Sequence, residues 1–160
     1  QMDAWKKRGF EYDVVPGVSS FLGTAAALRQ EYTLPGISQT VIITRNEGRT
    51  PVPEREKLRS LAAHHATMCI FLSISMIEEV VAELVAGGYE KTTPIAIVQR
   101  ATWPEQKILR GTLETIAEQV KAEEIDRTAM IVVGECLDAD YELSQLYAPG
   151  FSHMFRDAKQ

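Results

Sequence analysis

The sequence predicts an α/β domain built on a mixed, partly antiparallel five-stranded sheet that is flanked by helices. Short apolar runs alternate with amphipathic segments along most of the chain, which is typical of a sheet covered by helices. Two of the predicted strands, 94–98 and 107–110, are separated by a short turn at Trp103-Pro104-Glu105. Such a turn makes the two strands antiparallel neighbours, so the sheet is not purely parallel.

The first elements are predicted in the order helix, strand, helix. The opening residues read as the last turns of a helix that stops at Gly9. Apolar and polar residues then alternate over 10–15, which predicts a strand. A Pro-Gly turn follows, and helical spacing predicts a helix over 18–29 with Ser19 or Ser20 as its N-cap.

The remaining elements follow from apolar runs and cap signals. Five runs rich in aliphatic and β-branched residues predict the strands of the sheet, at 40–44, 68–72, 94–98, 107–110 and 129–133. Three further segments predict helices, at 54–63, from Ser75 to Gly87 and from Thr112 to Lys121. Residues 137–160 lack periodicity and are predicted to form an extended tail.

Composition excludes several classes of protein. The 160 residues are 45% hydrophobic and 24% charged, which suits a globular domain, and no apolar run approaches the roughly 20 residues of a membrane helix. The net charge of −5 argues against a domain devoted to nucleic acid. Cys69 and Cys136 lie in apolar runs and are predicted to be small buried hydrophobic residues. We therefore expect a protein of the reducing cytoplasm.

Several common sites are missing from the sequence. It has no phosphate-binding glycine loop, no zinc-spaced cysteine pair and no Ser-His-Asp set. His64 and His65 are adjacent, so on a helix they point about 100° apart and are predicted to be surface residues at a helix end. We predict a site without a metal ion.

Four segments, in this order along the chain, resemble the tetrapyrrole methylase family, which transfers methyl groups from S-adenosylmethionine to uroporphyrinogen-derived macrocycles. These segments are 14–20, 40–45, 94–102 and 128–134. Within the family, the loop at 44–54 and the segment 101–107 resemble the branch that methylates carbon 11 of precorrin-4 or cobalt-precorrin-4 in cobalamin biosynthesis. The ordered set is more specific than any one segment, because Pro-Gly turns and aliphatic strands are common.

The resemblance implies a two-domain enzyme with S-adenosylmethionine held between the domains. The family's glycine-rich loop and Gly-Asp-Pro stretch are missing from this sequence. The expected division is therefore the end of the first domain at 1–15, the second domain at 16–136 and the tail at 137–160. We expect such a fragment to be incomplete for catalysis, and an uncovered apolar face to favour a homodimer.

The resemblance also assigns residues to the methyl donor, whose product is S-adenosylhomocysteine. The residues that match donor-binding positions are Ser19, Ser20, Leu72, Ala101, Thr102, Ala129 and Met130. Each has a structural alternative. Leu72 and Met130 would be ordinary core residues in any α/β domain, and Ser19 would serve as a helix cap.

The acceptor carries many carboxylates, and the segment from Arg45 to Arg59 concentrates basic residues in an acidic chain. Arginine suits carboxylates because its planar fork donates two parallel hydrogen bonds. We expect Arg45 and Arg49 to bind substrate carboxylates, with Thr50 and Pro51 of the same loop beside them. A solvated loop whose charges pair locally is the alternative.

Two other functions remain open at this point. The first is methylation of another tetrapyrrole, either uroporphyrinogen III or precorrin-3, and the loop at 44–54 is the segment that should discriminate between acceptors. The second is a binding or assembly domain without catalysis. The sequence assigns no catalytic base.

Overall fold

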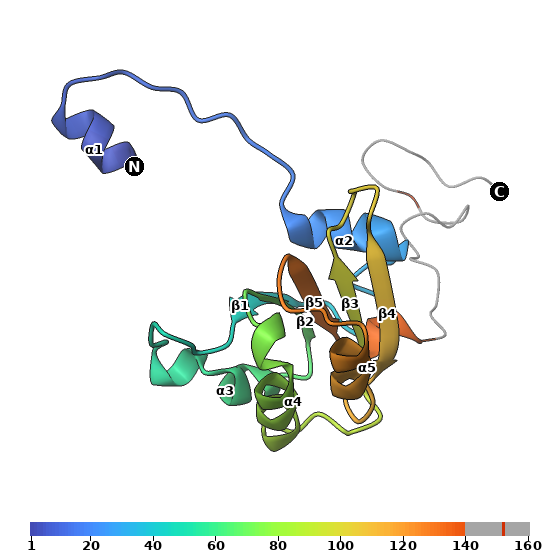
Figure 1. Ribbon diagram of the computed structural model, residues 1–160. Coiled ribbons are helices and arrows are strands. Elements are labelled where there is room, and N and C mark those ends of the chain that lie inside the picture. Colours follow the sequence, from blue (N-terminus) through green and yellow to red (C-terminus); the bar gives the residue numbers. More distant parts are fainter. Residues whose placement is uncertain (140–151, 153–160) are drawn as a thin grey trace.

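The computed structural model describes residues 1–139 and residue 152. Figure 1 shows a sheet with helices on both faces, and a long N-terminal arm that carries a detached helix. The longer elements are the helices α1 (Met2–Lys7), α2 (Ser20–Leu28), α3 (Leu58–Ala62), α4 (Ile77–Ala86) and α5 (Ile116–Ala122), and the strands β1 (Val41–Arg45), β2 (Thr67–Phe71), β3 (Pro94–Gln99), β4 (Lys107–Thr112) and β5 (Ala129–Val133). Three short 3₁₀ helices are η1 (Glu54–Glu56), η2 (Ile74–Met76) and η3 (Glu135–Leu137).

The sheet has five strands in the order β1-β2-β5-β3-β4. β1 and β2 are parallel, and the other neighbouring pairs are antiparallel. The predicted mixed sheet is therefore confirmed, and so is the antiparallel hairpin of β3 and β4. β5 is the last strand in sequence but lies in the middle of the sheet, where it is buried from Met130 onward.

Alternation of side chains along the strands divides the core into two layers. One face of β2, β5 and β3 packs against α3, α4 and α5, and this layer includes Ile70, Ile97, Ile131, Val80 and Ile116. These side chains are essentially inaccessible to water. Burial of a side chain of this size contributes about 1.5–3 kcal/mol, so this layer is the main source of stability.

The opposite face of the same strands is covered by α2, the segment after it and η3. Cys69, Val98 and Val132 point into this second layer, where they meet Leu28 and Tyr32. Both cysteines are buried and free, as their apolar surroundings predicted. The helices on both faces confirm the predicted sheet flanked by helices.

The strand predicted at 10–15 is not formed. This segment is extended and exposed, and Val15 retains 86% of its accessible surface. A strand needs a neighbour to satisfy its backbone N–H and C=O groups, and none of the described residues pairs with it. The preceding helix is present as α1, and Figure 1 shows it separated from the sheet.

Three helix starts differ from the prediction. The helix predicted at 54–63 is divided by extended backbone at Lys57 into η1 and α3. Ser75 lies inside η2 rather than at a cap, so α4 begins only at Ile77. Thr112 is the last residue of β4, and α5 begins after Thr115, whose hydroxyl accepts a hydrogen bond from the Thr112 N–H over 3.1 Å.

The predicted tail begins later than expected. Leu137 belongs to η3 and is buried against the second core layer. Residues 140–151 and 153–160 of the predicted tail lie outside the described residues. His64 and His65 are exposed just after α3, as predicted.

Candidate functional site

The candidate site lies at one rim of the sheet, where several strand ends meet. β1 and β2 run in the same direction, and β5 is antiparallel to both β2 and β3. The carboxyl ends of β1, β2 and β3 therefore share this rim with the amino end of β5. Loops that leave these ends carry most of the residues assigned by sequence.

The backbone at this rim adopts positive φ angles at four residues that are not glycine. They are Leu72 (φ 54°), Arg100 (φ 49°), Thr102 (φ 72°) and Thr128 (φ 55°). Such conformations cost about 1–3 kcal/mol each and are least favourable for β-branched residues such as threonine. Residues of this kind cluster at ligand-binding sites, where the surrounding structure holds them in place.

A cavity of ≈ 360 Å³ opens at this rim between α2, the end of β2 and the turn after β3. Its lining includes five of the seven residues that the resemblance assigned to the methyl donor: Ser20, Leu72, Ala101, Ala129 and Met130. Its size lies at the lower end of the range for small-molecule sites. Five residues that the resemblance selected from distant parts of the sequence therefore line one cavity.

Leu72 is strongly exposed and keeps 82% of its accessible surface. It directly follows β2, at a backbone angle that turns its side chain out of the core. Met130 by contrast is 4% exposed and contributes to the second core layer as well as to the cavity. Leu72 is therefore not a core residue. Met130 is a core residue and also lines the cavity.

The other two assigned residues lie next to the cavity. Ser19 occupies the N-cap position of α2, but its side chain makes no capping hydrogen bond. Thr102 forms the turn after β3, where its methyl carbon lies in van der Waals range of the position a Cβ would take at Gly23. α2 therefore rests directly on this turn.

Thr24 was missed by the sequence analysis. It lies in α2 at the cavity, its side chain is fully buried, and Oγ1 has no hydrogen-bond partner among the described residues. A buried hydroxyl without a partner carries an unfavourable desolvation energy of roughly 1–3 kcal/mol. In sequence Thr24 is one residue in an alanine-rich helix, so no local signal distinguishes it.

Arg100, Trp103 and Thr128 were also missed as cavity residues. Each adjoins a residue that the resemblance did assign, which is the only signal the sequence offers.

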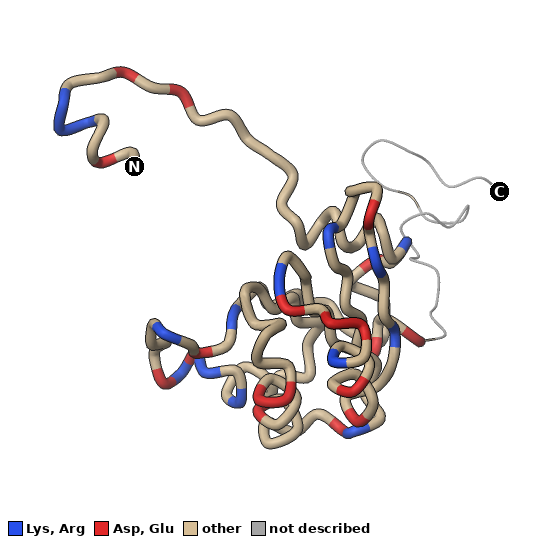
Figure 2. Tube along the Cα trace, viewed as in Figure 1, with Lys and Arg blue, Asp and Glu red and all other residues tan. Residues whose placement is uncertain are grey.

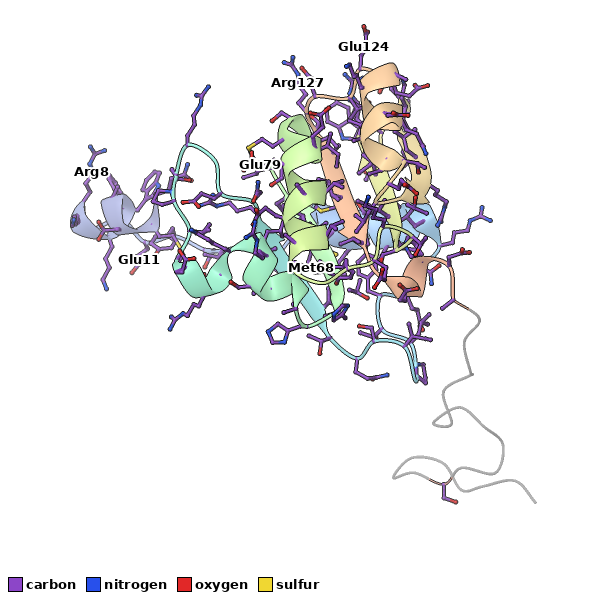
Figure 3. The ribbon with its side chains drawn as sticks, turned by 90° about the horizontal axis from the view of Figure 1, so that it is seen from below. Arg8, Glu11, Met68, Glu79, Glu124 and Arg127 are labelled. Carbon is purple, nitrogen blue, oxygen red and sulfur yellow. The ribbon has the colours of Figure 1, made fainter. Side chains whose placement is uncertain are left out.

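Asp126 and Arg127 complete the same rim, and two hydrogen bonds of 2.9 and 2.7 Å join their side chains. The Arg127 guanidinium lowers the pKa of the Asp126 carboxyl through these bonds. Figure 3 shows Arg127 at the periphery of the molecule.

The loop after β1 borders a second hollow of ≈ 390 Å³. Of the residues assigned to the acceptor, Arg45 and Pro51 line this hollow, whereas Arg49 and Thr50 are exposed on the loop without lining it. Phe71, at the end of β2, lines both this hollow and the cavity. The two spaces are therefore adjacent and share one wall.

Arg45 binds its own loop. Its guanidinium donates hydrogen bonds to the carbonyl oxygens of Asn46 and Thr50, both over 3.1 Å, and of Pro51 over 3.0 Å. A guanidinium with its five donors can hold several backbone carbonyls at once. Arg45 thus fixes the shape of the loop, and its terminal nitrogen atoms already have partners.

The other basic residues of this segment differ in their partners. Ion pairs join Arg55 to Glu56, Lys57 to Glu54 and Arg59 to Glu83. Figure 2 shows acidic and basic residues side by side along this segment. Within residues 1–139, Arg49 is the one member of this basic group with no hydrogen bond or ion pair of its side chain.

A polar contact fixes the base of the loop to the rest of the domain. The buried Asn46 donates from its backbone N–H to the Ser73 hydroxyl over 2.9 Å and from Nδ2 to Oε1 of Glu79 over 3.2 Å. Ser73 in turn donates to the carbonyl oxygen of Phe71 over 2.7 Å. Figure 3 shows Glu79 on the side of α4 that faces this loop. The loop is therefore held both by Arg45 and by α4.

The described residues offer neither a metal site nor a membrane-spanning helix. Among residues 1–139 and 152, no group of three or more His, Cys, Asp or Glu side chains is arranged to hold a metal ion. No helix in the same part of the chain has the length and apolarity needed to cross a membrane.

Known proteins of similar sequence belong to one family. The profile of the tetrapyrrole (corrin/porphyrin) methylases matches residues 1–117. A cobalt-precorrin-4 C(11)-methyltransferase of Methanocaldococcus jannaschii is 54% identical over 157 residues, which cover 98% of this chain and 61% of that protein. A precorrin-4 C(11)-methyltransferase of Mycobacterium tuberculosis is 45% identical over 142 residues, covering 88% of this chain and 57% of that protein.

Solved structures agree with this result. The X-ray structure of a cobalt precorrin-4 methyltransferase, a cobalamin biosynthetic enzyme, superimposes with a TM-score of 0.83 at 43% identity, over 86% of this chain and 58% of that one. The uroporphyrin-III C-methyltransferase of Thermus thermophilus complexed with S-adenosylhomocysteine has a TM-score of 0.67 at 22% identity and covers 85% of this chain and 58% of that one, which shows a shared fold.

The chain spans about three fifths of the length of the curated relatives it matches. Within that span, the family profile, the relatives at more than 40% identity and the fold all lead to one result. The chain belongs to the tetrapyrrole (corrin/porphyrin) methylase family.

Proposed function

We propose that the protein transfers a methyl group from S-adenosylmethionine to carbon 11 of precorrin-4 or cobalt-precorrin-4, and that this chain supplies one wall of the donor site together with the acceptor loop. The observation that carries the proposal is the cavity at the sheet rim, because Ser20, Leu72 and Ala101, which are distant in sequence, line it together. The names of the relatives support the same reaction.

The residues of the cavity fit an adenosyl group. The lining is mainly apolar, with the exposed Leu72 side chain available for contact, and it includes a fully buried hydroxyl at Thr24 that lacks a partner. Sites for small molecules combine apolar walls with a few polar groups in this way. When bound, S-adenosylmethionine would supply a methyl group to the acceptor carbon in an in-line displacement, in which the methyl C–S bond breaks and S-adenosylhomocysteine leaves.

This chain's own residues mainly orient the reactants and exclude water. Leu72 and Met130 present apolar surface to the donor, and the turn at Ala101 leaves space for it. An in-line displacement gains its rate from alignment at short distance. The loop after β1 lies across Phe71 from the donor cavity, so an acceptor bound at this loop would lie beside that cavity.

Arg49 is the residue that we assign to an acceptor carboxylate. Its guanidinium is exposed and free of partners within residues 1–139, on a loop whose shape Arg45 fixes. Arginine donates two parallel hydrogen bonds to a carboxylate. Arg45 keeps a supporting role, since its terminal nitrogen atoms bind loop carbonyls.

The test is methyl transfer by the full-length protein that contains this chain, with three acceptors in parallel: cobalt-precorrin-4, metal-free precorrin-4 and uroporphyrinogen III. We expect methylation of one or both precorrins. Preferential methylation of uroporphyrinogen III would overturn the choice of acceptor while leaving the family reaction intact. Failure of the wild-type protein to bind S-adenosylhomocysteine by calorimetry would overturn the donor site itself.

Two variants separate the roles of the loop and the cavity. Arg49→Ala should raise KM for the acceptor about tenfold or more, the loss expected for a charged hydrogen bond, and leave the Kd for S-adenosylhomocysteine unchanged. Leu72→Asp should weaken S-adenosylhomocysteine binding. Arg55→Ala is the matched control, because Arg55 is exposed and its ion pair is with its own neighbour, Glu56.

A further inference from the structure

Trp103 carries a feature that the methyl transfer proposed above does not account for. The residue is 56% exposed although its side chain carries a large apolar ring surface. Among residues 1–139 the ring has no hydrogen-bond partner and no aromatic neighbour. The residue nevertheless lines the cavity at the rim of the sheet.

The turn that bears Trp103 is held firmly at its backbone. The N–H of Trp103 donates to the carbonyl oxygen of Arg100 over 2.9 Å, and the N–H of Gln106 donates to the carbonyl oxygen of Trp103 over 3.1 Å. The side chain of Gln106 also accepts a hydrogen bond of 2.8 Å from the Thr102 N–H. These bonds fix the direction in which the turn presents its central residue.

Two further contacts attach the same turn to the domain. Arg100 donates from its N–H to the carbonyl oxygen of Thr128 over 2.8 Å, across the rim from β3 to β5. α2 meets the turn at Gly23, where a Cβ would lie 3.7 Å from the methyl carbon of Thr102 and 3.9 Å from the Cβ of Ala101. Arg100 and Thr102 both have positive φ angles. The unfavourable φ angles of Arg100 and Thr102 are therefore maintained in the same turn that leaves the Trp103 indole exposed.

The volume of the cavity limits which part of a ligand can contact the indole. A space of ≈ 360 Å³ accommodates a nucleoside, whereas a macrocycle of four pyrrole rings with its carboxylate arms needs the wider, open side of the site. A purine base offers a flat π face, and stacking of a base on an aromatic side chain is favourable for any base. Ala101, two residues before Trp103, lines the same cavity and leaves room beside the ring.

We propose that Trp103 is a further binding residue for the methyl donor, whose adenine base stacks on the indole at the mouth of the cavity. The proposal rests on the donor site described under the proposed function. It assigns a residue that recognises the base, which is distinct from the residues that align the methyl group. The purine ring would shield from water the face of the indole that residues 1–139 leave exposed.

The experiment uses S-adenosylhomocysteine as the probe, since it carries the adenosyl group but no sulfonium charge. Isothermal titration calorimetry compares the wild-type protein with Trp103→Ala and Trp103→Phe. We expect Trp103→Ala to weaken binding about ten- to a hundredfold, the loss that corresponds to removal of an aromatic platform under one base. Trp103→Phe keeps an aromatic face and should retain most of the affinity.

Fluorescence supplies a second readout and a matched control. The sequence contains two tryptophans, and Trp5 lies in α1, on the arm that Figure 1 shows away from the sheet. In the Trp5→Phe variant the emission comes from Trp103 alone, and S-adenosylhomocysteine should quench it. In the Trp103→Phe variant the emission comes from Trp5 and should not respond to the ligand.

The outcomes distinguish the two proposals. If the wild-type protein binds S-adenosylhomocysteine but Trp103→Ala binds it equally well, the role of Trp103 is overturned and the proposed function stands. Quenching of Trp103 by a tetrapyrrole alone also overturns the role, because the indole then faces the acceptor. If the wild-type protein does not bind S-adenosylhomocysteine, the donor site is overturned and the assignment of Trp103 with it.

Discussion

The Nη2 atom of Arg45 donates a hydrogen bond of 3.0 Å to the carbonyl oxygen of Pro51, which closes the loop after β1 on itself. A second nitrogen of the same guanidinium binds the carbonyl oxygens of Asn46 and Thr50. An arginine expected to face the substrate therefore serves first to shape the loop that carries Arg49.

Replacement of Arg45 by lysine should loosen this loop. Lysine keeps the charge but lacks the planar fork that reaches several carbonyl oxygens. We expect faster hydrogen exchange of the amides at 46–52 and a loss of about 1 kcal/mol in the free energy of unfolding. Hydrogen-exchange mass spectrometry measures the first effect, and Arg49→Lys is the control, since the Arg49 side chain has no partner to lose within the described part of the chain. Equal exchange in both variants would contradict the structural role of Arg45.

Replacement by valine should have opposite effects on stability at Thr24 and at Thr67. Both side chains are fully buried, but the Thr24 hydroxyl has no partner among residues 1–139, whereas Thr67 donates to the carbonyl oxygen of Tyr32 over 2.6 Å. Thr24→Val should raise the free energy of unfolding of the ligand-free protein by about 1 kcal/mol, and Thr67→Val should lower it by a similar amount. Urea denaturation measures both, and a loss of stability in Thr24→Val would contradict the prediction.

The thiol of Cys69 makes stability depend on pH in the alkaline range. Burial raises the pKa of this thiol to about 12 from its ordinary value of 9.0. Between these values the unfolded chain releases the proton and the folded chain keeps it, so the free energy of unfolding falls as pH rises. One such group contributes up to about 1.4 kcal/mol per pH unit.

The check is urea denaturation across this pH range. Wild-type protein should lose stability more steeply above pH 9 than Cys69→Ala, which has no thiol to titrate at this position. The two should show the same slope below pH 8. Parallel curves through the alkaline range would mean that the Cys69 thiol ionises in the folded protein.

The exposed apolar side chains of the N-terminal arm lead us to expect self-association of the protein. Trp5, Phe10, Val15 and Val18 are all more than half exposed, with fractions of 51%, 55%, 86% and 81%. Exposed apolar side chains in such number favour contact with another protein surface, and we expect a second copy of the chain to cover them. Sedimentation velocity should show a concentration-dependent dimer, and Trp5→Ser combined with Val15→Ser should shift it toward the monomer. A wild-type protein that stays monomeric at every concentration would contradict this prediction.

The amino-acid sequence by itself determined the strands of the sheet, the hairpin of β3 and β4 and the family. These features depend on local periodicity, on turn residues and on short ordered segments, all of which are legible along a single chain. It also identified Ser20, Leu72 and Ala101 as neighbours in space, through their match to the family.

Only the tertiary structure decided which of these residues are free to act. Residues 10–15 have the alternation of a strand, but a strand exists only where another segment pairs with it. Arg45 and Arg49 are the same residue type in one loop, yet Arg45 binds backbone carbonyls whereas Arg49 has no side-chain partner among residues 1–139. Hydrogen-bond partners and exposure depend on segments far apart in sequence. The exposure of the Trp103 indole, and the lack of a partner for the Thr24 hydroxyl among residues 1–139, can therefore be recognised only in the folded chain.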